Sequence, residues 1–312
     1  MGVNRINPGD ETPLIRPAPG PVWVFHNGAL GDSVLLWPML RALRAGGATV
    51  TLVAPGSRAR LAAAELGIRP LDLEQPRFSS MWNPGFVPSP IDGVSRVATF
   101  IADAGSAGGR AWLDAATAMF PGALIEPLPA PIDRPAALRL GGAAGAAPAR
   151  RSGEGPMVFH LGAGSRVKMW PVERWERLWQ ALGAAPRVIA GEAEAERFNA
   201  AERVAMDRMG GVFLSDLDGL AAILRSARLF VGCDTGPTHL AAQLGIPTLA
   251  LFGPTDPEQW GPIGPAVFPA EAFHLFRFES DDWHGPWGQT LTWELLHGWR
   301  LGAPPPAGGN AQ

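Results

Sequence analysis

The sequence of 312 residues has one cysteine, one lysine, no tyrosine and no long uninterrupted apolar run. The single cysteine, Cys233, excludes an internal disulfide framework and fits a reducing compartment. Arg41 and Arg44 interrupt the longest apolar stretch, so we expect no membrane-spanning helix. The polar, proline-rich residues 1–20 lack the apolar core of a secretory signal. Together these absences predict a cytoplasmic protein.

Basic residues are in slight deficit, with 26 against 29 acidic residues and a net charge of -3. This balance argues against a nucleic-acid partner, because nucleic-acid-binding domains normally present a basic surface. A content of 46% hydrophobic and 18% charged residues is typical of a globular protein. At roughly 150 residues per domain, the length predicts two domains.

Lysine is nearly absent, because Lys168 is the one lysine among the 26 basic residues. One interpretation is that the base composition of the genome favours arginine codons and that a single lysine is present by chance. The alternative is that position 168 needs a compact point charge in place of a planar guanidinium.

Strand and helix patterns alternate along the first half of the chain. Short connections between them predict a parallel sheet with right-handed crossovers. Pro38 lies inside one helical pattern, which predicts a kink or a late start of that helix. We expect strands over 22–25 and 48–54, helices over 33–43 and 58–66, and a long loop over 76–93.

The alternation begins again after Gly141–Gly155, a stretch of small residues that we interpret as a linker. Two Rossmann-like domains, 1–150 and 156–312, are therefore expected to face each other across a cleft, with ligands at the carboxyl ends of the strands. We expect strands over 157–161, 187–190, 212–214, 229–232 and 248–252, and helices over 172–182, 193–209, 220–227 and 238–244.

The first strand-to-helix loop that carries chemistry runs from Gly28 to Ser33. Gly28 and Gly31 allow a tight turn and a close approach of a ligand to the backbone. Asp32 has two interpretations: it caps the following helix, or it is a carboxylate exposed at the cleft and placed to accept a proton.

The second loop runs from Gly162 to Pro171 and contains Gly164, Ser165 and Lys168. Backbone amides and the serine hydroxyl would donate to phosphate oxygens, and the ammonium would offset the charge of a diphosphate. The loop is not a Walker A motif, and Val167 stands where a dinucleotide fingerprint needs its third glycine.

The third loop runs over residues 234–242. Thr235, Gly236 and Thr238 supply amides and hydroxyls at a helix N-terminus, and His239 falls in its first turn. An ordinary capping turn would explain Asp234 and Thr235 but not the whole cluster.

Three weaker signals have structural alternatives. Asp216-Leu217-Asp218 matches the Asp-x-Asp pattern of metal-dependent sugar transferases, but its place between a strand and a helix favours capping. Cys233 is interpreted as a buried residue at a strand end. His26 and His160 lie beside the first and second loops, in either a packing role or a site role.

Tryptophan is abundant, with twelve residues, and several crowd the last 30 positions. The spacing predicts a C-terminal helix that packs against the first domain. Contact with a membrane surface is the alternative, although few cations are present in this segment. The crowded residues are Trp283, Trp287, Trp293 and Trp299.

The three loops resemble glycosyltransferase family 9, the ADP-heptose:lipopolysaccharide heptosyltransferase family. Phe252–Pro257 and Trp260–Pro262 are similar to its C-terminal signature. The resemblance covers roughly residues 21–265. It is strongest in the third loop, whereas residues 76–140, where acceptor recognition is expected, show no matching motif.

The resemblance implies a GT-B fold, in which the N-terminal domain binds the acceptor and the C-terminal domain binds the nucleotide-sugar. Asp32 would be the catalytic base, in the loop that holds Gly28 and Gly31. Glu192 would bind the ribose hydroxyls, with Glu194 two residues away as the other candidate. The full donor-binding set would be Gly164, Ser165, Lys168, Glu192, Asp234, Thr235, Gly236, Pro237 and His239.

The implied function is inverting transfer of heptose from ADP-heptose to a lipopolysaccharide-type or other glycan acceptor, with no metal ion and no cofactor. The enzyme would be cytoplasmic or peripheral at the inner face of the inner membrane. A non-catalytic nucleotide-sugar-binding protein and a Rossmann oxidoreductase are the alternatives. Asp32 argues against the first, and the missing third glycine argues against the second.

Overall fold

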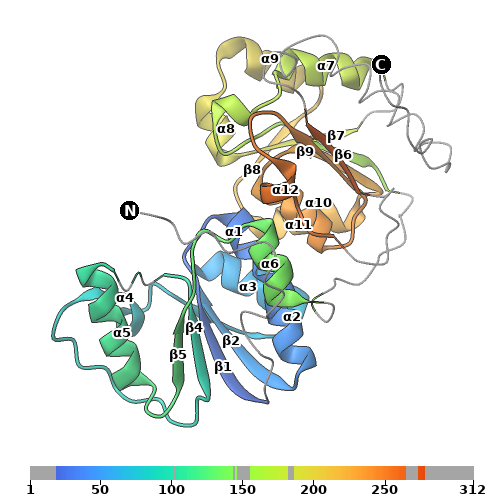
Figure 1. Cartoon of the computed structure of the whole chain (residues 1–312). Helices are drawn as coiled ribbons and strands as arrows, with labels where there is room; N and C mark the ends of the chain where they lie inside the picture. The colour runs from blue at the N-terminus through green and yellow to red at the C-terminus, as the bar shows by residue number, and fades with distance from the viewer. Residues whose placement is uncertain are drawn as a thin grey trace. The chain divides into compact units, whose positions relative to one another are not determined.

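The computed structural model describes residues 19–101, 103, 105–142, 145, 155–181, 186–264 and 273–277. The chain divides into two compact units, Met1–Ala146 and Ala147–Gln312 (Figure 1). Most of the predicted linker, and the whole tryptophan-rich tail, lie outside the described residues.

Unit 1 contains a five-stranded parallel sheet of order β3-β2-β1-β4-β5. Its elements are β1 Gly20–Phe25, α1 Leu30–Leu35, α2 Trp37–Ala45, β2 Ala48–Ala54, α3 Gly56–Leu66, β3 Arg69–Asp72, α4 Pro76–Ser79, η1 Ser80–Trp82, β4 Arg96–Thr99, α5 Ala107–Met119, β5 Leu124–Pro127 and α6 Arg134–Gly141.

The helix predicted over 33–43 is two helices. α1 ends at Leu35, and α2 begins at Trp37 with Pro38 in its first turn. A proline is tolerated there because the first amides of a helix have no intrahelical partner. The late helix start expected from Pro38 is confirmed.

The loop predicted over 76–93 is wrong for its first seven residues, which form α4 and η1. Phe78 and Met81 explain the difference, because both are fully buried. The Phe78 ring lies 6.1 Å from Trp23 and 5.5 Å from Phe25, between ring centroids. The sequence analysis also did not predict β4, α5, β5 and α6. The two strands of this set are only four residues long.

Unit 2 contains a six-stranded parallel sheet of order β11-β10-β9-β6-β7-β8. Its elements are β6 Met157–His160, η3 Arg166–Lys168, α7 Val172–Ala181, β7 Arg187–Gly191, α8 Glu192–Arg197, α9 Ala200–Arg208, β8 Val212–Leu214, α10 Leu217–Ser226, β9 Leu229–Cys233, α11 Gly236–Gln243, β10 Thr248–Phe252, α12 Pro257–Trp260 and β11 Phe273–Arg277.

The single helix predicted over 193–209 is broken into α8 and α9. Phe198 and Asn199 between them have extended backbone. The Asn199 side chain accepts a hydrogen bond from the Glu202 amide at 3.0 Å, and the Glu202 carboxylate accepts one from the Asn199 amide at 2.8 Å. This reciprocal capping box starts a new helix, and an asparagine inside a helical pattern was the available signal.

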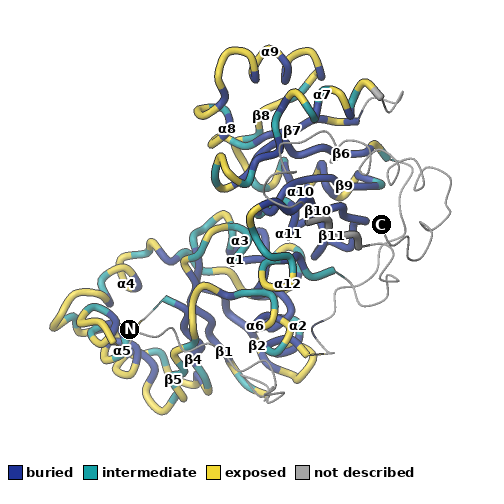
Figure 2. The backbone as a smooth tube through the Cα atoms, turned by 45° about the horizontal axis from the view of Figure 1, so that its top comes forward, coloured by how far each residue is buried: buried dark blue, intermediate teal, exposed yellow. Residues whose placement is uncertain are grey.

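The order of the strands places a topological switch point in each sheet. In chain order, unit 2 reads as 6-5-4-1-2-3 and unit 1 as 3-2-1-4-5, which is the Rossmann arrangement and its five-stranded part. The predicted fold class, α/β with two Rossmann-like units as in GT-B proteins, is confirmed. The central strands of both sheets are largely buried, whereas β3, β5 and β8 and the outward faces of α5 and α9 are exposed or half-buried (Figure 2). The switch points lie between β1 and β4 and between β6 and β9.

Among the described residues, no helix combines the length and the apolar character needed to cross a membrane.

Candidate functional site

The second and third loops predicted from the sequence meet because their strands are neighbours. β6 and β9 pair in parallel, with His160 opposite Gly232. The loop after β6 carries Lys168, and the loop after β9 carries Asp234. Parallel neighbours end at the same edge of a sheet, so both loops open at the switch point of unit 2.

Lys168 and Asp234 form an ion pair at this edge. The Lys168 Nζ lies 2.8 Å from Asp234 Oδ2. Thr255, in the segment after β10, donates its hydroxyl to the same oxygen at 2.9 Å. The one lysine of the sequence therefore lies beside the start of the third loop.

His239 approaches the other oxygen of the Asp234 carboxylate, with Nε2 3.7 Å from Oδ1. Its Nδ1 is buried and makes no hydrogen bond in the described structure. Burial acts to raise the pKa of Asp234, but contacts with His239 and Lys168 outweigh it and hold the pKa below its ordinary value. The carboxylate is therefore ionised at neutral pH.

Fewer backbone amides are available for a ligand at the start of α11 than the sequence predicted. Pro237 has no N–H, and the amides of Thr238 and His239 both donate to the Thr235 carbonyl. The Thr238 hydroxyl donates to the Cys233 carbonyl at 2.5 Å and lies 3.0 Å from the Thr235 hydroxyl. Gly236, the first residue of α11, contributes the amide at the helix entrance. Asp234 makes side-chain contacts rather than a cap, so capping alone does not explain it.

The glycines of the loop after β6 differ in what they do. A Cβ at Gly162 would lie 2.6 Å from the Glu194 carboxylate and 2.7 Å from His160 Cε1, so glycine is needed there. A Cβ at Gly164 would meet no atom within 4 Å. Gly164 and Ser165 lie at the outer part of the loop, where Gly164 is exposed and Ser165 half-buried.

Of the two acidic residues considered for the ribose, Glu192 is exposed and Glu194 is buried. Glu194 Oε2 accepts a hydrogen bond from the Gly191 amide at 3.0 Å. Its carboxylate also lies against Gly162, at the open edge of the sheet. The structure therefore brings Glu194, and not Glu192, to the loop after β6.

Asp32 lies in the first turn of α1 at the switch point of unit 1. Its Oδ2 accepts a hydrogen bond from the Ala29 amide at 3.2 Å, so it does cap, from the third helical position. A Cβ at Gly28 would lie 2.7 Å from both Asp32 Cβ and His26 Nε2, so glycine keeps these two side chains close together. Gly31 is the second residue of α1 rather than part of the turn. The Asp32 side chain is half-buried, and capping of α1 engages its Oδ2.

Both histidines beside the loops are buried. Burial, with a smaller contribution from Arg58, lowers the pKa of His26 to about 4. Burial also lowers the pKa of His160 to about 4, and the backbone of Gly162 opposes this by a smaller amount. His26 Nδ1 accepts a hydrogen bond from the Gly28 amide at 3.3 Å. Both imidazoles are therefore neutral at pH 7.

The capping interpretation of Asp216 is confirmed, because its Oδ1 accepts a hydrogen bond from the Gly219 amide at 2.6 Å. Cys233 is a fully buried strand end, as predicted, and burial raises its pKa to about 12. Within the part of the chain that the structure describes, no three His, Cys, Asp or Glu side chains cluster as a metal site would require.

Two hollows lie in unit 1, in the region without a recognisable motif. One, of about 410 Å³, lies between Asn83–Phe86 and α5 and includes Arg110. The other, of about 470 Å³, is lined by Arg77, Phe86 and Val87, among others. Phe86 borders both hollows.

Sequence reasoning missed Thr255 and Glu202 and assigned less weight to Glu194. A sequence repeat could have drawn attention to the turn at Gly162, which Glu194 contacts. Val-Phe-His-x-Gly-Ala occurs at 24–29 and again at 158–163, at the end of the central strand of each unit. Thr255 lies in the segment Phe252–Pro257 that resembles the C-terminal signature, but nothing local links it to Asp234, 21 residues away. Glu202 likewise gives no local sign of Arg166, 36 residues away.

Part of the chain is similar in sequence to a known family. Residues 130–271 match the model of glycosyltransferase family 9 (heptosyltransferase). Lipopolysaccharide heptosyltransferase 1 of Pseudomonas aeruginosa is 38% identical over 112 residues, which are 35% of this chain and 31% of that protein. The same enzyme of Escherichia coli K12 is 32% identical over 105 residues, 31% of each chain. The alignments thus span about a third of the length of these curated relatives.

Solved structures match over nearly the whole chain. Escherichia coli ADP-heptose lps heptosyltransferase II aligns with a TM-score of 0.58 and 16% identity, over 90% of this chain and 98% of that one. The heptosyltransferase WaaC of Escherichia coli with ADP aligns with a TM-score of 0.54 and 17% identity, over 89% and 99%. At this identity the match shows the shared fold.

Proposed function

We propose that this chain, which contains a glycosyltransferase family 9 domain over residues 130–271, transfers heptose from ADP-heptose to a lipopolysaccharide-type glycan. The observation that carries the proposal is the cluster at the switch point of unit 2. There the one lysine of the sequence pairs with Asp234, whose carboxylate is also contacted by His239 and Thr255. One relative in this fold binds ADP, a ligand whose diphosphate suits a cation at such an edge.

Unit 2 is the donor-binding unit in this proposal. Lys168 exchanges its carboxylate partner for the diphosphate and offsets the charge that develops as ADP leaves. Ser165 and the Gly164 and Gly236 amides donate to phosphate oxygens. His239 and Asp234 hold the donor near the lysine, and Glu194 takes the ribose-binding role first considered for Glu192.

Unit 1 binds the acceptor and provides the base. Asp32 removes the proton of an acceptor hydroxyl, whose oxygen forms a bond to the anomeric carbon as the bond from that carbon to ADP breaks. ADP leaves with the bonding electrons, and the proton on Asp32 passes to water. A single displacement inverts the anomeric centre, and Lys168 supplies the charge that a metal ion provides in other transferases.

The hollows beside Phe86 are suited to the acceptor, because they combine apolar walls with Arg77 and Arg110. Arginines in such hollows favour a glycan that carries carboxylates or phosphates. A glycolipid acceptor would bring the enzyme to the inner face of the cytoplasmic membrane.

A screen of nucleotides and nucleotide-sugars tests the donor assignment. Thermal stabilisation of the purified protein is measured with ADP-, GDP- and UDP-sugars, and with NAD as the control for an oxidoreductase. We expect ADP-sugars to stabilise the protein most. Stabilisation by NAD alone would contradict the proposal, and ADP-sugar binding without turnover on any glycan acceptor would favour a non-catalytic binding protein.

A further inference from the structure

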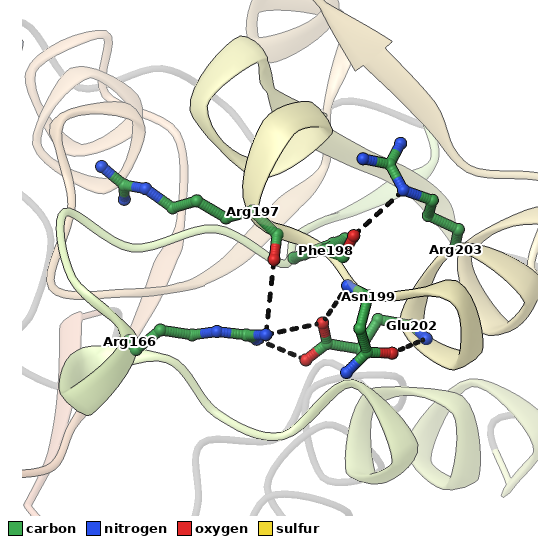
Figure 3. A network of polar contacts seen from close by, with 6 residues as sticks. All are labelled: Arg166, Arg197, Phe198, Asn199, Glu202 and Arg203. Atoms are coloured by element: carbon green, nitrogen blue, oxygen red, sulfur yellow. Dashed lines mark hydrogen bonds and ion pairs between the residues drawn. The ribbon is translucent and has the colours of Figure 1, made fainter.

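The loop after β6 carries two cations on one turn, and they point to different partners. Lys168 and Arg166 belong to the same 3-10 turn, η3. Lys168 pairs with Asp234, whereas Arg166 faces Glu202 at the start of α9 (Figure 3). From their position in the loop alone, both cations would be expected to bind a phosphate-rich ligand. In the structure, however, they pair with carboxylates in different elements.

Arg166 meets Glu202 through both terminal nitrogens of its guanidinium. Its Nη1 contacts Oε1, and its Nη2 lies 3.0 Å from Oε2 and 3.4 Å from the Arg197 carbonyl. A two-point contact between a planar guanidinium and a carboxylate fixes orientation as well as distance. The pair therefore holds the turn in one orientation relative to α9.

The Glu202 carboxylate is a rigid acceptor for this contact. Its side chain is 10% exposed, and it also accepts the Asn199 amide in the capping box of α9. Arg203 braces the same junction by donating to the Phe198 carbonyl at 3.0 Å. Arg166 and the Asn199 amide outweigh the effect of burial and hold the pKa of Glu202 below its ordinary value. Removal of Arg166 would leave this buried charge without its cation.

The rest of the loop shows why the turn needs such a contact. On the upstream side Ala163 is buried, and on the downstream side Met169 and Trp170 are buried in the core. Between them, residues 164–168 are exposed or half-buried, so apolar packing does not fix their position. Polar contacts remain, namely those of Arg166, the ion pair of Lys168 with Asp234, and those of Arg197 Nη1 with the carbonyls of Ala163 and Gly164, both at 3.4 Å.

We propose that Arg166 and Glu202 are a positioning pair, which fixes the η3 turn so that Lys168 is directed toward the diphosphate of the donor. This inference rests on the proposed function, because it assigns the pair an effect on the phosphate end of a nucleotide. Neither residue touches the donor. Their effect passes through the backbone from position 166 to position 168.

Calorimetry with ADP and AMP tests the pair. Arg166→Met removes the cation and keeps the length of the side chain, and Glu202→Gln removes the charge and keeps an oxygen for the Asn199 amide. We expect each variant to bind ADP about three- to thirtyfold more weakly than wild type. AMP, which lacks the terminal phosphate, should lose less affinity.

The Arg208–Glu176 pair provides a matched control in the same unit. It is also a two-point contact from α9, with Nε–Oε1 at 2.6 Å and Nη2–Oε2 at 2.9 Å, and it joins α9 to α7 instead of to the loop. Arg208→Met and Glu176→Gln should leave ADP affinity unchanged. Circular dichroism and melting temperature identify any variant that fails to fold.

The double variant Arg166→Met/Glu202→Gln separates a pair from two independent residues. If the two act together, its ADP affinity falls no further than that of the weaker-binding single variant. Additive losses, equal losses for ADP and AMP, or losses shared by the control pair would overturn the positioning role and leave the proposed function intact. A wild-type protein that binds no ADP would overturn the proposed function and the positioning role with it.

Discussion

The two units end their central strands with the same six-residue pattern and then use it differently. Val-Phe-His-x-Gly-Ala closes β1 in unit 1 and β6 in unit 2. In both, a buried histidine with a pKa lowered to about 4 lies beside a glycine that leaves no room for a Cβ. The pattern therefore builds a common turn at each switch point.

The carboxylates next to these glycines come from different places. In unit 1 it is Asp32, four residues after Gly28 in the first turn of α1. In unit 2 it is Glu194, which lies beyond the next strand, in α8. The loop of unit 2 is long enough to add η3 and its lysine. The turn is common to both units, and the side chains around it differ: Asp32 follows it directly in unit 1, whereas Glu194 and Lys168 lie near it in unit 2.

Removal of the carboxylate in unit 1 should have the largest effect. Asp32→Asn keeps an oxygen for the Ala29 amide but cannot act as a base, so we expect turnover to fall about 10²–10⁴-fold. Donor binding should be unchanged by calorimetry with ADP. Asp133, which caps α6 through the Ala136 amide, gives the control variant Asp133→Asn. Equal loss of ADP affinity and turnover would reassign Asp32 to a structural role.

Removal of the cation in unit 2 should have the next largest effect. Lys168→Met should lower turnover on the order of 10²–10³-fold, because one charge-stabilising group is lost, and should weaken ADP binding as well. Lys168→Arg should restore little, since a planar guanidinium does not replace a compact ammonium at the same site. Full activity of Lys168→Arg in a transfer assay would show that the one lysine is there by chance.

The glycines test whether the two turns are equivalent. Gly28→Ala and Gly162→Ala place a Cβ within 2.7 Å of side-chain atoms, so each should destabilise its unit by about 1–3 kcal/mol. Gly164→Ala has open space and should change stability by less than about 0.5 kcal/mol. Urea unfolding measures all three. Similar losses at 28 and 164 would contradict the packing argument.

The two buried histidines should make the stability of the fold depend on pH. In the folded protein His26 and His160 stay neutral down to about pH 4, whereas the unfolded chain takes up protons near pH 6.5. Stability should therefore fall as the pH drops from 6.5 toward 4, by about 1 kcal/mol per pH unit for each histidine. His26→Asn and His160→Asn should each flatten the decline in melting temperature. An unchanged slope in either variant would show that its histidine ionises when folded.

The sequence alone allows much of this arrangement to be predicted. Strands 48–54, 212–214 and 248–252 are predicted with the bounds observed, because β-branched and apolar runs between turns carry a strong local signal. The meeting of Lys168 and Asp234 follows from parallel strands and a shared edge. The elements over 96–141 are missed because two strands of four residues carry little pattern.

The exact side-chain pairs between distant segments lie beyond such reasoning, even where the meeting of two loops can be predicted. Thr255 reaches Asp234 from the segment after β10, and Glu202 reaches Arg166 across two helices and a strand. No local propensity encodes either distance. The break before Asn199 is the exception, because a capping residue inside a helical pattern can be recognised in advance.

The ion pair between Lys168 and Asp234 has a consequence for which solutes can enter the site. A cation that is already paired with a carboxylate of the protein binds chloride or acetate weakly, since each of these anions carries no more charge than the carboxylate that it would replace. A polyanion such as a diphosphate carries more negative charge and more hydrogen-bond acceptors, so it can compete with the carboxylate for the lysine. In the proposed function, the resting pair would therefore disfavour binding of small monovalent anions relative to a nucleotide diphosphate.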